Sequence, residues 1–261
     1  MEPVISFDLD HTLMINPFRR WVFPEIEAWL SPQLPASSTA MEYILREHRN
    51  RLAHQDKVAA YDWDGILETV CRQVQSTPPF TVKDLVHKHA VIGKVWLYPD
   101  TLPSLRCLKK EKIPLIAATN GWECYQRPVT DCLGITSFFS EYHTPVNCRA
   151  VKPEASFFDF RGHRSLIHVG DRLNQDILGA NRAGVTSVWI YRELDERWHG
   201  MNAAERKLHP DFHRVLTERL HQEGHTGSLS SEYVPDYVIV SLKELLPVWK
   251  RERSRFSESA G

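Results

Sequence analysis

Short apolar runs alternate with helical patterns over most of the chain, and the first of these runs lies close to the amino terminus. Residues 4–7 are mainly apolar and are bounded by polar residues. A run of this length is typical of a buried central strand in a parallel sheet. Similar runs predict strands at 113–118, 165–169 and 186–190, and the run at 235–241 predicts an edge strand.

Helical patterns separate these runs. One helix is expected from residues 98–100 to about 112, and a second ends at about 133. Others open at 151–154, cover about 174–182 and span 242–249. A proline near the first turn favours the helix start at 151–154. Strands that alternate with helices favour a doubly wound, Rossmann-like parallel sheet with helices on both faces. The predicted fold class is therefore α/β.

Residues 15–96 differ, because they carry helical signals and no convincing strand. Proline at a first turn and Ser or Thr at an N-cap mark the helix starts. Helices are expected from Pro24, from a cap at Ser37 or Ser38 to Arg51, over 57–74, and from Thr81 to His89.

This contrast predicts two domains. A smaller α-helical domain at 15–96 is inserted into a core formed by residues 1–14 and 97–261. The polar, charged end at 250–261 is expected to be a flexible tail.

Composition excludes several classes of protein. The chain has 261 residues, 42% of them hydrophobic, which suffices for one large or two small domains. A formal net charge of -1 gives no electrostatic reason to expect nucleic acid or an anionic membrane as a partner. No apolar run approaches the roughly 20 residues that span a bilayer. The first residues lack a basic region, so no signal peptide is expected, and the five scattered cysteines are expected to be reduced. These features favour a cytoplasmic protein.

Two carboxylates directly follow the first predicted strand. Asp8 and Asp10 stand two residues apart at its carboxyl end, where open α/β sheets place their ligands. Acids this close repel each other unless a cation or a shared proton offsets their charge. Mg²⁺, which prefers oxygen ligands, would do so. Alone, the pair is also compatible with a turn or a helix cap.

Other polar residues come after the later strands. Thr119, Lys152, Asp171 and Asp176 all stand at predicted strand ends or in the loops after them. In a doubly wound sheet these ends converge on one crevice. Several acids, one hydroxyl and one cation suit phosphoryl transfer, which needs a metal ion, a nucleophile and positive charge at the transferring oxygens.

The ordered set of motifs resembles that of the haloacid dehalogenase (HAD) superfamily. The four motifs are Asp8-Leu9-Asp10-His11-Thr12, Thr119-Asn120-Gly121, Lys152-Pro153, and Gly170-Asp171 followed by Asp176. His11 departs from the common pattern, which has Gly there, and is expected to pack at the rim of the site. Residues 15–96 match the position of the helical cap that this family inserts between its first two motifs.

The resemblance implies a role for each catalytic residue. Asp8 would attack phosphorus and form an aspartyl-phosphate. Asp10 would protonate the leaving oxygen and then activate water; its presence favours a phosphatase over a dehalogenase. Thr119 would bind a phosphoryl oxygen, and Lys152 would neutralise transferring charge and hold Asp8 ionised.

The resemblance also implies the ligands of a metal ion and of the phosphate. Mg²⁺ would be bound by Asp8, the main-chain carbonyl of Asp10, and Asp171, with Asp176 ligating directly or through water. Asn120 and Gly121 are candidate donors to the phosphate. Arg20, close after the first motif, is a candidate substrate contact, as is its neighbour Arg19. Exposed arginines are more often solvated, which is the alternative for both.

Together these features predict a magnesium-dependent phosphatase that hydrolyses a small phosphorylated metabolite through an aspartyl-phosphate. A phosphotransferase or phosphomutase of the same fold is one alternative, and a catalytically weak binding or regulatory protein is another. Intact acids at positions 8, 10 and 171 argue against the last.

Residues 193–232 are longer than a connection requires and are rich in histidine. His209 and His213 have the i,i+4 spacing of a zinc site on a helix. Pro210 and the lack of nearby cysteine weaken that interpretation, so packed or solvated histidines are expected.

Overall fold

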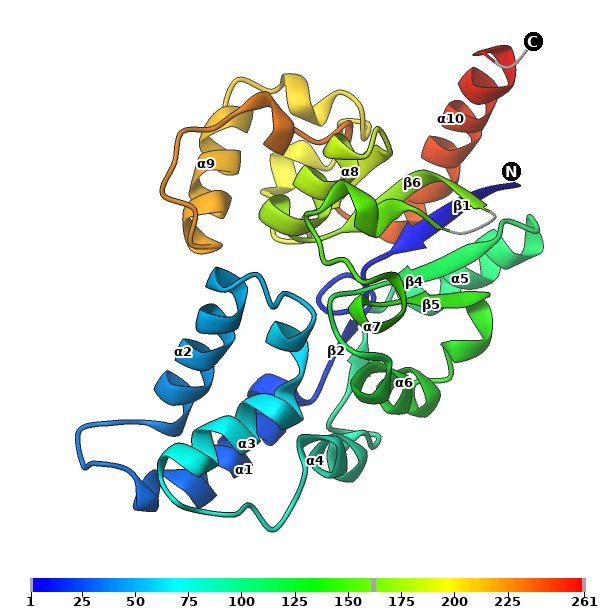
Figure 1. The fold of residues 1–261 in the computed structure, drawn as a ribbon. Coiled ribbons are helices and arrows are strands. Elements are labelled where there is room, and N and C mark those ends of the chain that lie inside the picture. The colour runs from blue at the N-terminus through cyan, green and yellow to red at the C-terminus, as the bar shows by residue number, and fades with distance from the viewer. Residues whose placement is uncertain (1, 161–162, 260–261) are drawn as a thin grey trace.

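A six-stranded parallel sheet forms the centre of the protein (Figure 1). The computed structural model describes residues 2–160 and 163–259. The strand order is β5-β4-β1-β6-β7-β8, so the strand that precedes Asp8 is central and the last strand lies at an edge, as predicted. The sheet strands are β1 (Glu2–Phe7), β4 (Leu115–Ala118), β5 (Glu141–His143), β6 (His163–Gly170), β7 (Thr186–Ile190) and β8 (Tyr237–Ile239).

Both faces of the sheet are covered by apolar side chains. Along β4, Leu115 and Ala117 belong to one buried cluster, whereas Ile116 and Ala118 belong to another. Helix α8 packs against β7, and α10 packs against β6 and α5. Burial on both faces explains why the strands appear in the sequence as continuous apolar runs. The predicted α/β fold is confirmed.

The helices of the described residues fall into two groups. The first group lies between β2 and β3 and comprises α1 (Phe23–Leu30), α2 (Ala40–Ala53), α3 (Trp63–Gln73) and α4 (Val82–His89), preceded by the π-helix η1 (Phe18–Val22). The second group flanks the sheet and comprises α5 (Thr101–Lys110), α6 (Glu123–Cys132), α7 (Pro145–Cys148), the π-helix η6 (Leu173–Ile177), α8 (Leu178–Arg182), α9 (Phe212–Gln222) and α10 (Leu245–Ser259).

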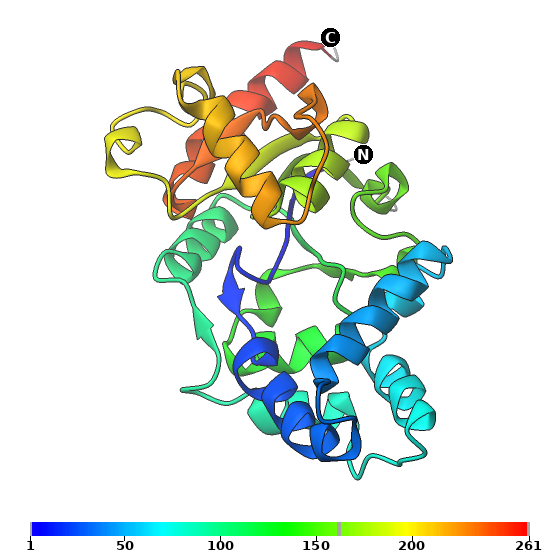
Figure 2. The same cartoon turned by 90° about the vertical axis from the view of Figure 1, so that its left-hand side faces the viewer.

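The first group forms a helical layer beside the sheet, drawn in blue and cyan in Figure 2. Two short strands, β2 (Met14–Ile15) and β3 (Trp96–Leu97), pair antiparallel where the chain enters and leaves this layer. No strand was expected at either place, because two-residue strands are too short for a periodic pattern. Their pairing holds together the two segments that connect the helical layer to the sheet.

Local caps shift two predicted helices. Thr39 rather than Ser37 or Ser38 caps α2, since Thr39 and Glu42 form a reciprocal capping box. The helix expected over 57–74 is interrupted, because the side chain of Asp62 accepts from the N–H of Gly65 and starts α3 anew. Thr81 caps α4 as predicted.

The helix expected at 151–154 is wrong. Only a short 3₁₀ turn forms, at Ala155–Phe158. The N–H of Lys152 donates to the Asn120 side chain at 2.8 Å, and the N–H of Val151 donates to Glu154 at 3.0 Å. The backbone of Glu154 is extended, with φ −69° and ψ 133°, so no helix can begin before Ala155. Strand β5 also escaped prediction, since it has three residues, at the end of the sheet.

The tail expected at 250–261 is instead helical up to Ser259, because α10 continues past Trp249. Glu252 explains part of this, since its carboxylate accepts from Tyr237 Oη and from Thr186 Oγ1 and so ties the helix to the sheet. Residues 260–261 lie outside the described residues. Across the part of the chain that is described, every helix is too short or too polar to cross a membrane.

Candidate active site

Polar residues from neighbouring strands meet at the carboxyl edge of the sheet. Asp8 follows β1, Thr119 follows β4 and Asp171 follows β6; these strands are adjacent. They border a cavity of about 290 Å³ that the helical layer closes from the other side with Arg19 and Tyr61. Six of the predicted site residues line it: Asp8, Asp10, Thr119, Asn120, Gly121 and Asp171.

Lys152 is buried next to Asp8, is not itself among the residues that line this cavity, and joins two of the acids. Its Nζ donates to Asp8 Oδ1 and to Asp176 Oδ1, each at 2.6 Å, and to the Ala118 carbonyl at 3.0 Å. Burial by itself lowers the pKa of this amine, but the charges of Asp176 and Asp8 outweigh burial and raise it. Lys152 is therefore a fixed buried cation.

The acids carry more negative charge than one lysine offsets. Burial, with added repulsion from Asp176 and Asp10, raises the pKa of Asp8 to about 7 although Lys152 opposes the shift. Burial also raises the pKa of Asp10, and burial with repulsion from Asp8 raises that of Asp171 well above its usual range. The pKa of Asp176 is lowered, because Lys152 and His168 outweigh the effect of burial.

Three of these carboxylates fit a divalent cation. Asp8, Asp171 and Asp176 each offer one oxygen, and the three oxygens lie within 4.8 Å of one another. Hard cations such as Mg²⁺ prefer oxygen ligands of this kind. The carboxylate of Asp10 is not part of this group: its Oδ2 accepts from Gln126 Nε2 at 2.7 Å, and its buried Oδ1 has no hydrogen-bond partner among the described residues.

A buried chain of hydrogen bonds supports Asp176. His168 Nε2 lies 3.1 Å from Asp176 Oδ1, and His168 Nδ1 lies 3.0 Å from Ser6 Oγ. Burial lowers the pKa of His168, which favours the neutral ring with its Nε2–H donated to Asp176. Sequence reasoning missed this pair, because Ser6 and His168 stand inside the apolar runs of two strands. Their adjacency depends on the β1–β6 register, which pairs them directly.

Two glycines let side chains approach the strand ends. A Cβ at Gly170 would lie 2.1 Å from Asp176 Cγ, and one at Gly121 would lie 2.3 Å from Gln126 Nε2. These glycines therefore allow Asp176 and Gln126 to reach the site. Gln126 was also missed, since a polar residue within a helical pattern carries no signal of its partner.

The second motif is held by internal hydrogen bonds. The N–H of Gly121 donates to Thr119 Oγ1 at 3.0 Å. Asn120 Oδ1 accepts from the N–H of Lys152, and Asn120 Nδ2 donates to the Lys152 carbonyl and to Tyr61 Oη. Asn120 thus positions Lys152 and contacts the helical layer, so a donation from its side-chain amide to phosphate would have to replace one of these bonds.

The geometry does not favour the predicted substrate contact at Arg20. Its guanidinium lies over the ring of Trp96, 5.2 Å from the centroid, and it is not among the residues that line the cavity. Arg19 and Arg172 line this cavity and also an adjoining one of about 420 Å³. Side chains in a π-helical turn point in different directions, which a sequence pattern does not reveal.

The remaining candidates have structural partners. His11 has a φ of 61°, which explains why glycine suits this position, and it lines the rim of the cavity as expected. His209 packs on Trp198, with ring centroids 3.9 Å apart, and precedes α9, so His209 and His213 do not share a helix. The packed interpretation therefore holds for His209.

Comparisons with known proteins show similarity in sequence and in fold. The chain is 37% identical over 110 residues to glyceraldehyde 3-phosphate phosphatase of Methanopyrus kandleri, covering 38% of this chain and 47% of the relative. It is 24% identical over 209 residues to the protein of that name from Methanocaldococcus jannaschii, covering 74% and 88%. The chain thus spans about half the length of the first relative it matches.

The crystal structure of a HAD phosphatase from Thermococcus onnurineus is similar in fold, with a TM-score of 0.62 at 24% identity, covering 95% of this chain and 98% of that one. A family model described as haloacid dehalogenase-like hydrolase matches residues 3–184. The chain therefore belongs to the haloacid dehalogenase-like hydrolases.

Proposed function

We propose that this protein is a magnesium-dependent phosphatase that hydrolyses a small phosphate monoester through an aspartyl-phosphate on Asp8. The observation that carries the proposal is the buried contact of Lys152 with both Asp8 and Asp176, beside a second acid, Asp10, that is held separately by Gln126. Asp8 is paired with the cation of Lys152, whereas Asp10 is bound by the neutral amide of Gln126 and is the acid that exchanges a proton in our proposal.

The two acids divide the chemistry. The Asp8 carboxylate attacks phosphorus, and the bond from phosphorus to the leaving oxygen breaks as Asp10 gives its proton to that oxygen. Asp10 then takes a proton from water, whose oxygen attacks phosphorus, and the bond to Asp8 breaks. The raised pKa of Asp10 suits the first step, because it favours the protonated form of the acid.

Lys152 and Thr119 prepare the phosphate site. Lys152 opposes the rise in the pKa of Asp8, which favours its charged form, and it offsets charge on the transferring group. Thr119, fixed by the N–H of Gly121, presents its hydroxyl to a phosphoryl oxygen. Asp8, Asp171, Asp176 and the main-chain carbonyl of Asp10 would hold Mg²⁺. The ion, when bound, neutralises charge on the phosphate and on the acids.

Side chains of the helical layer would contact the substrate. In our proposal residues 15–96 act as a cap whose Arg19 and Tyr61 face the leaving group across the cavity. Arg172, from the core, extends the same wall. The relatives named glyceraldehyde 3-phosphate phosphatase make that triose phosphate the first substrate to test. A phosphotransferase remains the second candidate on chemical grounds, since it would use the same acids.

Phosphate release tests the proposal. The substrates are glyceraldehyde 3-phosphate, phosphoglycolate, sugar phosphates, nucleotides and an aryl phosphate, each with Mg²⁺ and with chelator. We expect turnover that requires Mg²⁺ and is lost in Asp8→Asn. Turnover that persists with chelator and in Asp8→Asn would contradict the mechanism. Release of the leaving alcohol without free phosphate, and only when an acceptor alcohol is added, would favour the phosphotransferase.

A further inference from the structure

Residues 193–232 contact the loop that carries Asp171 and Asp176, here called the metal loop (residues 170–177). The contact comes from Glu223, which directly follows α9. Its carboxylate accepts from the N–H of Leu173 at 3.1 Å and from the N–H of Asn174 at 2.9 Å, and its carbonyl accepts from Asn174 Nδ2 at 3.2 Å. The Glu223 side chain is only 5% exposed.

These N–H groups have a particular need for partners. Leu173 and Asn174 open the π-helix η6, and its N-cap, Arg172, makes no side-chain cap. The first N–H groups of a helix lack acceptors within it, and a carboxylate is the favoured partner at that end. Glu223 therefore caps η6 from about 50 residues away, while Asp176 Oδ2 accepts from the N–H of Arg172 on the inner side at 3.0 Å.

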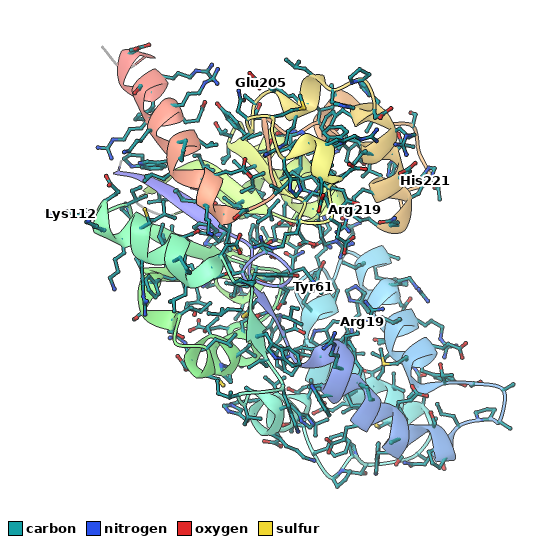
Figure 3. All side chains as sticks on the ribbon, turned by 180° about the vertical axis from the view of Figure 1, so that it is seen from behind. Arg19, Tyr61, Lys112, Glu205, Arg219 and His221 are labelled. Carbon is teal, nitrogen blue, oxygen red and sulfur yellow. The ribbon has the colours of Figure 1, made fainter. Side chains whose placement is uncertain are left out.

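Arg219 extends the contact to the metal-facing acid itself. Its Nε donates to Glu223 Oε1 at 2.9 Å, and its terminal nitrogen lies 3.2 Å from Asp171 Oδ2. The carbonyl of Asp171 also accepts from Trp189 Nε1 at 2.9 Å. Figure 3 labels Arg219 near the junction of the core with the layer that carries Arg19 and Tyr61. The metal loop is thus bound on its outer side by α9.

We propose that Glu223 and Arg219 are positioning residues that hold the metal loop in its cation-binding geometry, so that residues 193–232 set the affinity for Mg²⁺. The inference rests on the magnesium site of the proposed function. The matched family region ends at residue 184, so both residues lie beyond it. Residues that orient metal ligands without touching the metal commonly change affinity about 10–100-fold when they are replaced.

The two residues differ in how cleanly they can be tested. Arg219 orients Asp171 but also places a positive charge beside the cation site, so its removal has two opposite effects on Mg²⁺. Glu223 bonds the backbone and side chain of the loop and Arg219. Glu223→Gln removes the charge but keeps an oxygen acceptor, so comparing Glu223→Ala with Glu223→Gln separates the positioning effect from the effect of charge.

The experiment is a calorimetric titration of the metal-free, full-length protein with Mg²⁺. We expect the dissociation constant to rise about tenfold in Glu223→Ala and less in Glu223→Gln, which keeps one oxygen acceptor. Glu218→Ala is the matched control, because Glu218 lies on the same helix, is exposed and pairs with Arg214 at 2.7 Å. Hydrogen exchange of the 173–174 amides should rise in Glu223→Ala and not in the control.

Kinetics supply a second readout. The Mg²⁺ concentration for half-maximal rate should rise in Glu223→Ala, with the lost rate recovered at high Mg²⁺, whereas a simple loss of folded protein would lower the rate at every concentration. Unchanged Mg²⁺ affinity in Glu223→Ala would overturn the inference; if that variant does not fold, unchanged affinity in Glu223→Gln would do so. A wild-type protein that binds no Mg²⁺ would overturn the proposed metal site as well, which separates the two failures.

Discussion

In the metal-free protein, the buried carboxylate of Asp8 is expected to destabilise the fold at neutral and higher pH. Its pKa is raised from 3.8 to about 7, chiefly because the carboxylate is buried. A raised pKa in the folded state stabilises the fold while the group is protonated, and that contribution is lost as pH rises towards the folded pKa. The stabilisation by protonated Asp8 is therefore lost between about pH 4 and pH 7.

The change that tests this is Asp8→Asn, which removes the charge and keeps the shape. The difference between a pKa of 3.8 and one of about 7 corresponds to about 4 kcal/mol of stability lost by the charged form. The asparagine oxygen can still accept from Lys152, which also keeps Asp176 at 2.6 Å. Asp8→Asn should therefore unfold at a higher urea concentration than the wild type at pH 8, and its free energy of unfolding should be larger by up to about 4 kcal/mol.

The assay is urea unfolding in chelator at pH 5 and pH 8, with circular dichroism as the signal. At pH 5 the two proteins should differ much less, because Asp8 is then mostly protonated and neutral. Adding Mg²⁺ at pH 8 should reverse the order, since a ligand that binds the folded wild type stabilises it. An Asp8→Asn protein that is equally or less stable than wild type at pH 8 in chelator would show that burial does not penalise the charged carboxylate.

Three further predictions concern the groups around the site. Lys152→Met should remove phosphatase activity and cost about 3–5 kcal/mol in urea unfolding at pH 8, because it leaves two buried carboxylates without their cation; a loss below about 1 kcal/mol would contradict this. Tyr61→Phe should cost about 1 kcal/mol and raise KM more than it lowers kcat, because the lost hydroxyl joins the helical layer to Asn120; steady-state kinetics showing a kcat loss at unchanged KM would count against it. Thr81→Ala should cost about 1 kcal/mol at unchanged kcat, since it removes a helix cap distant from the site, and Thr81→Ser should restore the urea midpoint.

The predictable part of the site is the part that stands at strand ends. Asp8, Thr119 and Asp171 each follow an apolar run, and a parallel sheet brings such positions to one edge whatever the details of packing. Lys152 was found through its motif, although the helix expected there does not form. Its buried position depends on Asn120, whose side chain binds its backbone.

The residues that were missed support others and do not themselves directly follow a predicted strand. Gln126 and His168 lie in an amphipathic helix and an apolar strand, where their polar atoms looked incidental. Glu223 stood in a histidine-rich stretch that drew attention to zinc. Each becomes meaningful only through its partner in the folded protein: Asp10 for Gln126, Asp176 for His168, and the N–H groups of the metal loop for Glu223.

Local sequence patterns were enough to establish the α/β class, the helical character of most of residues 15–96 and the acids at the sheet edge, because these follow from periodicity and from the geometry of parallel strands. Packing in three dimensions was needed to show which arginine lines the cavity, what supports Asp176 and what caps the metal loop. Those contacts join residues roughly 10 to 160 positions apart, and their formation depends on strand register, helix rotation and packing, none of which a local pattern specifies.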